Sequence, residues 1–264
     1  MNKLINGFKY IKRGVSFFKK NKNLLEWHYI HSKRLIQFNN IHNNESCFII
    51  GNGPSLNKMD LSLLKDYHTF GLNKIFLIFD KVDLNLTYHV AVNPLVIKQS
   101  IIEFEQLKCP SFLSYETAHK LTYNSDNIYF LATDSQFPVQ YSFYSDILQP
   151  ITEGYTVTYV AMQIAFYMGF KNVFLIGVDH NFKASGQPNE EQFLTGEDRN
   201  HFDPRYFSNK QWHLPDLEAS ELSYHLAKFF FNRAGRQIFD ATVDGKLEIF
   251  PKISYDQALR ICNE

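Results

Sequence analysis

A glycine turn directly follows an apolar run early in the chain. Residues Cys47–Leu56 read Cys-Phe-Ile-Ile-Gly-Asn-Gly-Pro-Ser-Leu, which predicts a buried strand ending in a loop that a ligand can approach. Because Gly51 and Gly53 have no Cβ atom, a phosphate could rest against their backbone N–H groups. Asn52 and Ser55 add side-chain hydrogen-bonding groups. A turn without a ligand explains this motif equally well, since it matches neither the dinucleotide fingerprint nor the ATPase phosphate loop.

A second candidate site surrounds the start of a predicted helix. Thr152-Glu153-Gly154 precedes a helix expected over Thr156–Met168, whose exposed N–H groups and dipole favour a phosphate. The apolar run Val173–Val178 then predicts a buried strand that ends at Asp179. Asp179 could bind a ribose hydroxyl or a metal ion, or it could cap the following loop.

The elements that must position these residues alternate along the chain. Strands are expected over 47–50, 69–72, 86–92, 111–114, 127–131 and 173–178, and helices over 61–64, 96–107, 156–168 and 216–231. This order predicts an α/β fold with a doubly wound, mostly parallel Rossmann-like sheet. Ligands bind such sheets beyond the carboxyl ends of the strands, so Asn73 and Asn93 are expected beside the glycine turn.

Long loops are expected over 117–127, 134–149 and 181–213. The last is rich in aromatic and cationic residues, which suits a lid over a sugar.

Composition limits the classes of protein that the chain can form. The 264 residues include 27 basic and 27 acidic side chains, so the net charge of zero gives no general attraction to nucleic acid. Three widely spaced cysteines, Cys47, Cys109 and Cys262, indicate a reducing compartment and neither a disulfide scaffold nor a zinc knuckle. No apolar run reaches the roughly 18 residues of a membrane span, and a signal peptide is not recognisable. We therefore expect a cytoplasmic protein, and its aromatic loops are compatible with a homo-oligomer.

Positive charge is concentrated at the amino terminus. Residues 1–34 carry nine lysines and arginines against one acid, Glu26, with apolar residues at helical spacing between them. Such a segment either lies on an anionic membrane surface, which would make the protein peripheral on the inner membrane, or packs its apolar stripe on the domain. We divide the chain into a basic helical extension (1–44), with a connector over 28–44, and a Rossmann-like nucleotide-binding domain (45–264).

Together these motifs resemble two related families over about residues 46 to 250. One is the MptE-like family, named for archaeal 6-hydroxymethylpterin diphosphokinases and widespread in bacterial surface-glycan clusters. The other is the bacterial sialyltransferase family 42, which transfers sialic acid from CMP-sialic acid to lipo-oligosaccharide. The motifs that carry the resemblance are the 49–56 turn, Asn73, Asn93-Pro94, Ile-Thr-x-Gly at 151–154 and Gly-Val-Asp at 177–179. The stretches 156–182, 201–202, 212–213 and 241–248 are most similar to MptE-like bacterial proteins.

The resemblance implies roles for individual residues. In the sialyltransferases the matching positions line the nucleotide site, which implies nucleotide binding by Gly51, Asn52, Gly53, Ser55, Asn73, Asn93, Thr152 and Gly154, with Glu153 and Asp179 at the same rim. A loop histidine before a helix is the general base there, and His213 is the best match. The sialyltransferases carry arginine and serine where this chain has Pro150 and Glu153. A neutral sugar or another nucleotide therefore fits as well as CMP-sialic acid.

Three functions follow from these observations. The first is a glycosyltransferase that moves a sugar from a nucleotide sugar to a surface glycan or lipo-oligosaccharide acceptor, with His213 as general base and no cofactor. The second is an MptE-like diphosphokinase, which would need ATP, Mg²⁺ and carboxylates such as Asp179. The third is a non-catalytic nucleotide-binding module. The basic amino terminus and the aromatic loop favour the first. Asp179, His180, His201 and Asp203 match no standard metal-binding spacing, so no metal site is predicted.

Overall fold

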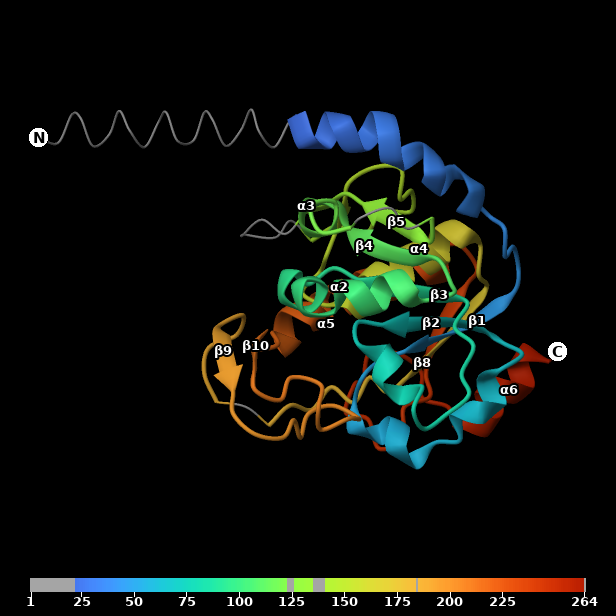
Figure 1. Ribbon diagram of the computed structural model, residues 1–264. Coiled ribbons are helices and arrows are strands. Elements are labelled where there is room, and N and C mark those ends of the chain that lie inside the picture. The colour runs from blue at the N-terminus through green and yellow to red at the C-terminus, as the bar shows by residue number, and fades with distance from the viewer. Residues whose placement is uncertain (1–21, 123–125, 135–140, 184, 264) are drawn as a thin grey trace, which may run out of the picture.

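The computed structural model describes residues 22–122, 126–134, 141–183 and 185–263. Most of the predicted basic helix, residues 1–21, lies outside the described residues. The rest forms an α/β Rossmann-like fold, in which helices cover both faces of a central twisted sheet (Figure 1). This confirms the predicted fold class.

The main sheet has seven parallel strands in the order β11-β8-β1-β2-β3-β4-β5. They are β1 (Ser46–Ile50), β2 (His68–Leu72), β3 (Tyr88–Ala91), β4 (Ser111–Ser114), β5 (Ile128–Leu131), β8 (Asn172–Ile176) and β11 (Gln237–Asp240). The central strands are buried, which explains their continuous apolar sequences. From β1 the chain moves outward to β5 and then returns to the other side of β1. The strand order therefore reverses between β1 and β8.

The helices lie on both faces of this sheet. Helix α4 (Val157–Met168) packs on β1, β2 and β3 and contacts α5 (Leu217–Arg233), while α2 (Pro94–Gln106) lies on the other face (Figure 1). Shorter helical segments are η3 (Pro54–Lys58), η4 (Leu61–Leu64), η5 (Ile75–Ile78), α3 (Tyr115–Ala118) and α6 (Tyr255–Cys262).

Local sequence sets where these helices begin and end. Thr156 caps α4 by accepting a hydrogen bond from the Thr158 N–H, and Gly169 ends it at φ 97°. Asp216 caps α5 in the same way, through the Ala219 N–H. In the part of the chain that is described, none of the helices combines the length and the apolarity that crossing a bilayer requires.

The segment before β1 differs from the expected connector. It contains a π-helical turn, η1 (Trp27–His31), and a 3₁₀ helix, η2 (Ser32–Phe38). Trp27 is almost fully buried and donates a hydrogen bond from Nε1 to the Phe130 carbonyl oxygen at 2.8 Å. The Phe38 ring contacts Tyr88, Phe112 and Tyr129 on the sheet. These apolar contacts hold the segment in helical form, whereas its Asn and His content alone indicates a loop.

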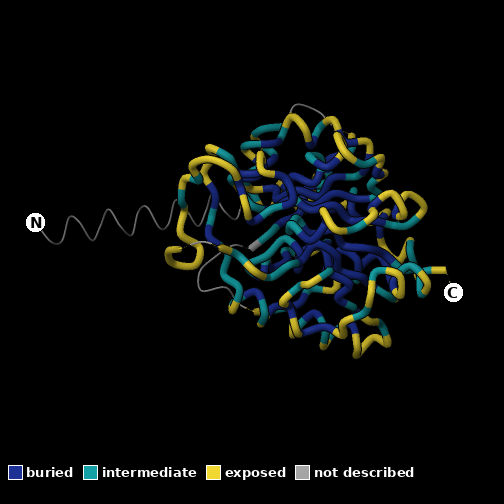
Figure 2. The backbone as a smooth tube through the Cα atoms, turned by 90° about the horizontal axis from the view of Figure 1, so that it is seen from below, coloured by how far each residue is buried: buried dark blue, intermediate teal, exposed yellow. Residues whose placement is uncertain are grey.

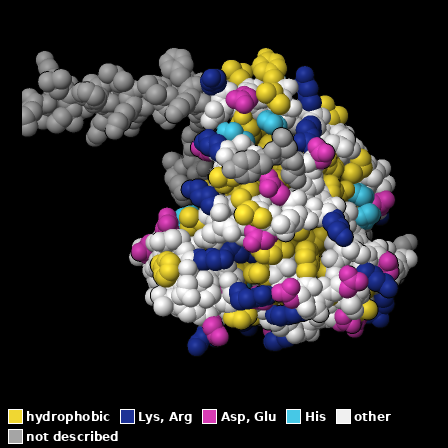
Figure 3. Space-filling model, in the orientation of Figure 1, with side chains coloured by type: hydrophobic (Ala, Val, Ile, Leu, Met, Phe, Trp, Pro, Cys, Tyr) yellow, Lys and Arg dark blue, Asp and Glu magenta, His cyan; other side chains and the backbone are white. Residues whose placement is uncertain are grey.

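The expected loop over 181–213 also contains regular structure. Strands β9 (Glu191–Leu194) and β10 (Lys210–His213) form an antiparallel hairpin. A second small sheet pairs β6 (Thr133–Asp134) with β7 (Ile151–Thr152) in parallel. Figure 2 shows the buried sheet at the centre of the molecule, with exposed residues at its periphery. Basic and acidic side chains are interspersed on the face seen in Figure 3, in keeping with the zero net charge.

Candidate active site

A cavity of about 470 Å³ opens beyond the carboxyl ends of β1, β2, β3 and β8. It lies at the reversal of strand order between β1 and β8, which is where doubly wound sheets bind ligands. The start of α4 and the segment 177–217 complete its wall. Eight predicted site residues line it: Gly51, Asn52, Gly53, Asn73, Asn93, Glu153, Asp179 and His213. Ser55, Thr152 and Gly154 lie behind its wall, and their roles are described below.

The two glycines of the first turn serve close packing rather than anion binding. The N–H of Gly51 donates to the Ile176 carbonyl and that of Gly53 to the Gly177 carbonyl, both at 2.8 Å. A Cβ atom on Gly51 would lie 2.3 Å from the Gly177 oxygen, and one on Gly53 would lie 1.8 Å from Asp179 Oδ2. The expectation that these amides are free for a phosphate was therefore wrong, because both already donate to carbonyl groups at the end of β8.

Asp179 fixes the glycine turn to the end of β8. Its Oδ1 accepts from the Ser55 N–H at 3.1 Å and its Oδ2 from the Ser55 hydroxyl at 2.6 Å. Burial raises the pKa of the Asp179 carboxyl, although the Ser55 hydrogen bonds and Lys58 oppose that rise. Asp179 thus caps the start of η3, and it also lines the cavity. Ser55 acts through Asp179 and is itself buried.

Asn52 and Asn73 place buried acceptors at the strand ends. The Oδ1 atoms of both side chains are buried and have no hydrogen-bond partner within the described structure. Buried polar atoms are nearly always paired, so these two oxygens are suited to N–H or O–H groups of a ligand. Asn73 adopts the left-handed conformation at φ 49°, and its carbonyl accepts from His89 Nε2 at 2.7 Å. Burial lowers the pKa of His89 to about 4, so this support is neutral.

Asn93 connects the end of β3 to His213. Its Oδ1 accepts from the N–H groups of Leu95 and Val96 as the cap of α2, so its Nδ2 is the atom that faces His213 Nδ1, at 3.2 Å. Since the amide nitrogen can only donate, His213 Nδ1 is the acceptor and Nε2 carries the proton in the neutral ring. Glu191 Oε2 lies 3.9 Å from that Nε2.

The helix entry is built by residues behind the cavity wall. The Thr152 hydroxyl donates to the Ser142 carbonyl at 2.6 Å, and the Thr152 carbonyl accepts from Gln163 Nε2 at 2.9 Å. Gly154 has φ 57°, and a Cβ atom there would lie 2.3 Å from the Tyr159 ring. Thr152 and Gly154 therefore shape the entry, while Glu153 and the first residues of α4 face the cavity.

Backbone conformation is unusual on two sides of the cavity. Tyr155, beside the entry to α4, and His180, beyond β8, are non-glycine residues in the left-handed region, at φ 63° and 52°. This conformation is costly for such side chains and is concentrated at functional sites. The Nε2 of His180 is 2.8 Å from Glu221 Oε1, which fixes the ring in the cavity wall.

A histidine–carboxylate pair, His201 with Asp198, is the main site feature that sequence reasoning missed. His201 lines the cavity, and its Nδ1 lies 2.8 Å from Asp198 Oδ2. Burial alone would raise the pKa of Asp198, but hydrogen bonds from His201 and from two backbone N–H groups outweigh it and hold that pKa below its usual value. The ionised Asp198 accepts the Nδ1 proton and leaves Nε2 of the neutral ring as a basic nitrogen.

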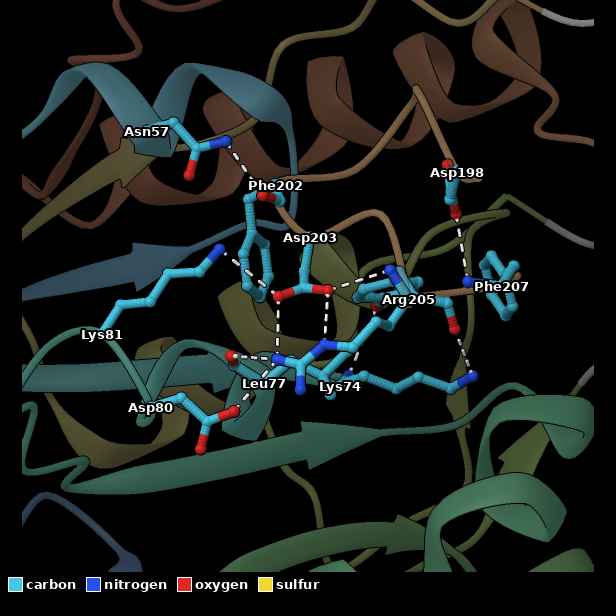
Figure 4. A network of polar contacts seen from close by, with 11 residues as sticks. Asn57, Lys74, Leu77, Asp80, Lys81, Asp198, Phe202, Asp203, Arg205 and Phe207 are labelled. Atoms are coloured by element: carbon cyan, nitrogen blue, oxygen red, sulfur yellow. Dashed lines mark hydrogen bonds and ion pairs between the residues drawn. The ribbon is translucent and has the colours of Figure 1, made fainter. Parts of the chain in front are cut away.

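The network in Figure 4 fixes the segment around Asp198, the carboxylate of this pair. Asp203, which is 2% exposed, accepts from Arg205 Nε and the Arg205 N–H, both at 2.9 Å, and Lys81 Nζ lies 3.4 Å from its Oδ2. Hydrogen bonds from Arg205 lower the pKa of Asp203 to about 2. The Phe202 N–H donates to the Asn52 carbonyl at 2.9 Å, which joins the same segment to the glycine turn.

The buried Lys74 binds the segment that carries His201. Lys74 directly follows Asn73, and its Nζ donates to Gln99 Oε1 and to the Tyr206 carbonyl, both at 2.7 Å. Burial lowers the pKa of Lys74 to about 7. The Tyr206 ring stacks on His201 at 4.0 Å between centroids. Lys74 therefore supports the His201 ring through Tyr206.

The structure defines a Rossmann-like protein with a cavity at the topological switch point of its sheet. The model of the family described as "6-hydroxymethylpterin diphosphokinase MptE-like" matches residues 18–185, and the chain belongs to this MptE-like family. A search of the curated proteins gives no match. Among solved structures, the MAf glycosyltransferase from Magnetospirillum magneticum AMB-1 matches at 12% identity with a TM-score of 0.49. That match covers 89% of this chain and 42% of the glycosyltransferase, so the chain spans less than half of that protein.

Proposed function

We propose that the protein is a transferase that moves a sugar from a nucleotide-activated donor to a hydroxyl group of a glycan acceptor. The observation that carries the proposal is the cavity itself. Its strand-end side carries the amide oxygens of Asn52 and Asn73. Its wall also holds three histidines, His180, His201 and His213, each of which has a carboxylate nearby. Such pairs suit removal of a proton from a sugar hydroxyl near neutral pH. A surface glycan or lipo-oligosaccharide as the acceptor is the class implied by the resemblance of the motifs.

The strand-end side of the cavity suits the nucleoside of the donor. The buried Oδ1 atoms of Asn52 and Asn73 would accept from N–H groups of the base or from ribose hydroxyls. The phosphate would lie toward the start of α4, where Thr156 and Val157 line the cavity and the helix dipole favours an anion. Because the Gly51 and Gly53 amides are occupied, the phosphate would depend on the helix and on hydroxyl or imidazole groups.

His201 and His213 are the two candidates for the general base. His213 lies on the cavity wall as the resemblance implies, but the Asn93 amide already occupies its Nδ1 lone pair. His201 has its Nδ1 held by the ionised Asp198, which directs basicity to Nε2. The geometry therefore favours His201 as the base and His213 as a group that binds and orients the substrate.

An MptE-like diphosphokinase is the second candidate, and the family description and the carboxylates of Glu153, Asp179 and Asp216 in the cavity favour it. It would need Mg²⁺ near a triphosphate. Each Asp179 oxygen accepts one hydrogen bond from Ser55 and keeps a second lone pair that could bind the metal ion. Among the described residues that line the cavity there is no lysine or arginine, which disfavours the four negative charges of ATP.

Thermal-shift measurements with CMP, UDP, GDP and ATP, each with and without Mg²⁺, test the proposal. We expect stabilisation by a nucleoside monophosphate or diphosphate in the absence of metal. Asn52→Ala and Asn73→Ala should weaken that stabilisation, while His225→Ala, an exposed residue on α5, should leave it unchanged. Stabilisation by ATP with Mg²⁺ alone would support the diphosphokinase. No stabilisation by any of the four would refute nucleotide binding at this cavity.

A further inference from the structure

We propose that His42, Glu45 and His68 form a binding site for Zn²⁺ at the amino ends of β1 and β2, on the opposite edge of the sheet from the cavity. Glu45 directly precedes β1, and His68 is the first residue of β2. His42 Nδ1 lies 2.6 Å and His68 Nε2 lies 2.9 Å from Glu45 Oε2. Each residue offers one ligand atom, and the three atoms lie within 4.8 Å of one another.

Two histidines and one carboxylate are a recurrent set of zinc ligands. Zinc bonds to imidazole nitrogen and carboxylate oxygen are about 2.0–2.2 Å long, which separates tetrahedral ligand atoms by about 3.3 Å. The present separations of 2.6 and 2.9 Å are therefore about 0.7 and 0.4 Å short of that spacing. Glu45 is about half exposed, so its side chain can move outward by this amount without disturbing the core.

A buried hydroxyl fixes the orientation of the first ligand. The second ring nitrogen of His42, Nε2, lies 2.7 Å from the Tyr88 hydroxyl, so Nε2 can donate while Nδ1 binds the metal. The His42 ring also stacks on Phe170, at 4.5 Å between centroids and 18° between planes. Zinc-binding histidines nearly always have such a partner on the other nitrogen, which fixes the tautomer and the ring orientation.

The backbone that carries the ligands is held independently of a metal. The N–H groups of Asn40, His42 and Asn44 donate to the carbonyl groups of Tyr167, Met168 and Gly169 at the end of α4. The Glu45 carbonyl accepts from the Lys171 N–H at 2.7 Å. A site held in this way loses little conformational entropy on binding, since the backbone that carries His42 and Glu45 is already fixed to the end of α4.

The donor set selects the class of metal. Two imidazoles disfavour Mg²⁺ and Ca²⁺, which prefer oxygen ligands, and none of the three residues is a thiolate. Glu45 and His68 are partly exposed, which leaves room for a water molecule as the fourth ligand. The bound ion would join the segment before β1 to the start of β2 and so stabilise this edge of the sheet.

Calorimetric titration of the full chain with ZnCl₂, without a histidine tag and after treatment with a chelator, tests the site. We expect one Zn²⁺ per chain and a higher melting temperature, by about 5 °C at a hundredfold excess over Kd. Glu45→Gln and His68→Ala should each weaken binding by more than about 100-fold. Tyr88→Phe should weaken it by about 10–100-fold, the usual effect of losing an outer hydrogen bond. His225→Ala, an exposed histidine outside the cluster, should bind as the unaltered chain does.

Two results would overturn the assignment. One is the absence of a saturable Zn²⁺ site in the unaltered chain, which needs no variant to interpret. The other is binding of equal strength and stoichiometry in Glu45→Gln and in the unaltered chain, which would place the ion elsewhere. Glu45 is partly exposed, so Glu45→Gln is expected to fold normally, and circular dichroism would verify this.

Discussion

The Asp203→Asn substitution measures how strongly the His201 segment is held on the sheet. Asn keeps the size of Asp, but its NH₂ group would face the Arg205 and Lys81 donors that Asp203 now accepts from. The pKa of Asp203 is lowered from 3.8 to about 2, and each tenfold change in proton affinity corresponds to about 1.4 kcal/mol. The ionised carboxylate therefore contributes about 2 kcal/mol, which screening around the half-exposed Arg205 and Lys81 reduces to about 1–2 kcal/mol.

The assay is urea unfolding followed by tryptophan fluorescence, with Asp80→Asn as the matched control. Asp80 also contacts Arg205, at 3.1 Å, but its side chain is 69% exposed, so its loss should change the free energy of unfolding by less than about 1 kcal/mol. A lowered pKa stabilises the fold only where Asp203 is ionised in the folded protein. The stability gap between the unaltered chain and Asp203→Asn should be constant above pH 5 and shrink as the pH falls from 4 to 2. Equal stabilities of Asp203→Asn and Asp80→Asn at pH 7 would refute the reasoning, as would a gap that persists at pH 2.

The remaining predictions concern the cavity. His201→Ala and Asp198→Asn should each lower transferase turnover by about 100-fold or more. Both variants should still bind the nucleotide in a thermal-shift measurement. Turnover close to normal in both variants would exclude His201 as the base. In Gly53→Ala the new Cβ atom would lie 1.8 Å from Asp179 Oδ2. This variant should therefore lose about 1–3 kcal/mol of stability in urea unfolding and should no longer bind the nucleotide. Unchanged binding would contradict the packing role of Gly53.

Most of the sheet could be predicted because its signals are local. Buried parallel strands read as short apolar runs, and the caps of α4 and α5 are visible as Thr156 and Asp216. Strand β11 and helix α6 were not predicted. Residues 237–240 of β11 alternate too briefly to stand out. Helix α6 does have a local signal, the capping box of Ser254 and Gln257, which sequence reasoning missed.

The sequence predicts where the candidate site residues lie, but not which of their groups already form hydrogen bonds. The carboxyl ends of parallel strands must meet at one edge, so Asn52, Asn73 and Asn93 converge as expected. What the sequence does not encode locally is which groups are already paired. The amides of Gly51 and Gly53 are occupied by β8, about 125 residues away, a pairing that depends on sheet order. Similarly, His201 becomes a candidate base only because the 198–207 segment folds back on itself around Asp198.

The hydrogen-bond acceptors and the histidines of the cavity come from different parts of the chain. The strand ends supply neutral acceptors on rigid backbone, whereas His180, His201 and His213 all come from the segment between β8 and α5. His213 contacts the strand-end side directly, through the Asn93 amide. If the proposed function holds, the strand ends set which nucleotide binds, and the 180–216 segment sets the acceptor and the proton transfer. Substitutions in that segment should therefore change turnover and acceptor choice more than nucleotide affinity, because loops tolerate change that a buried parallel sheet does not.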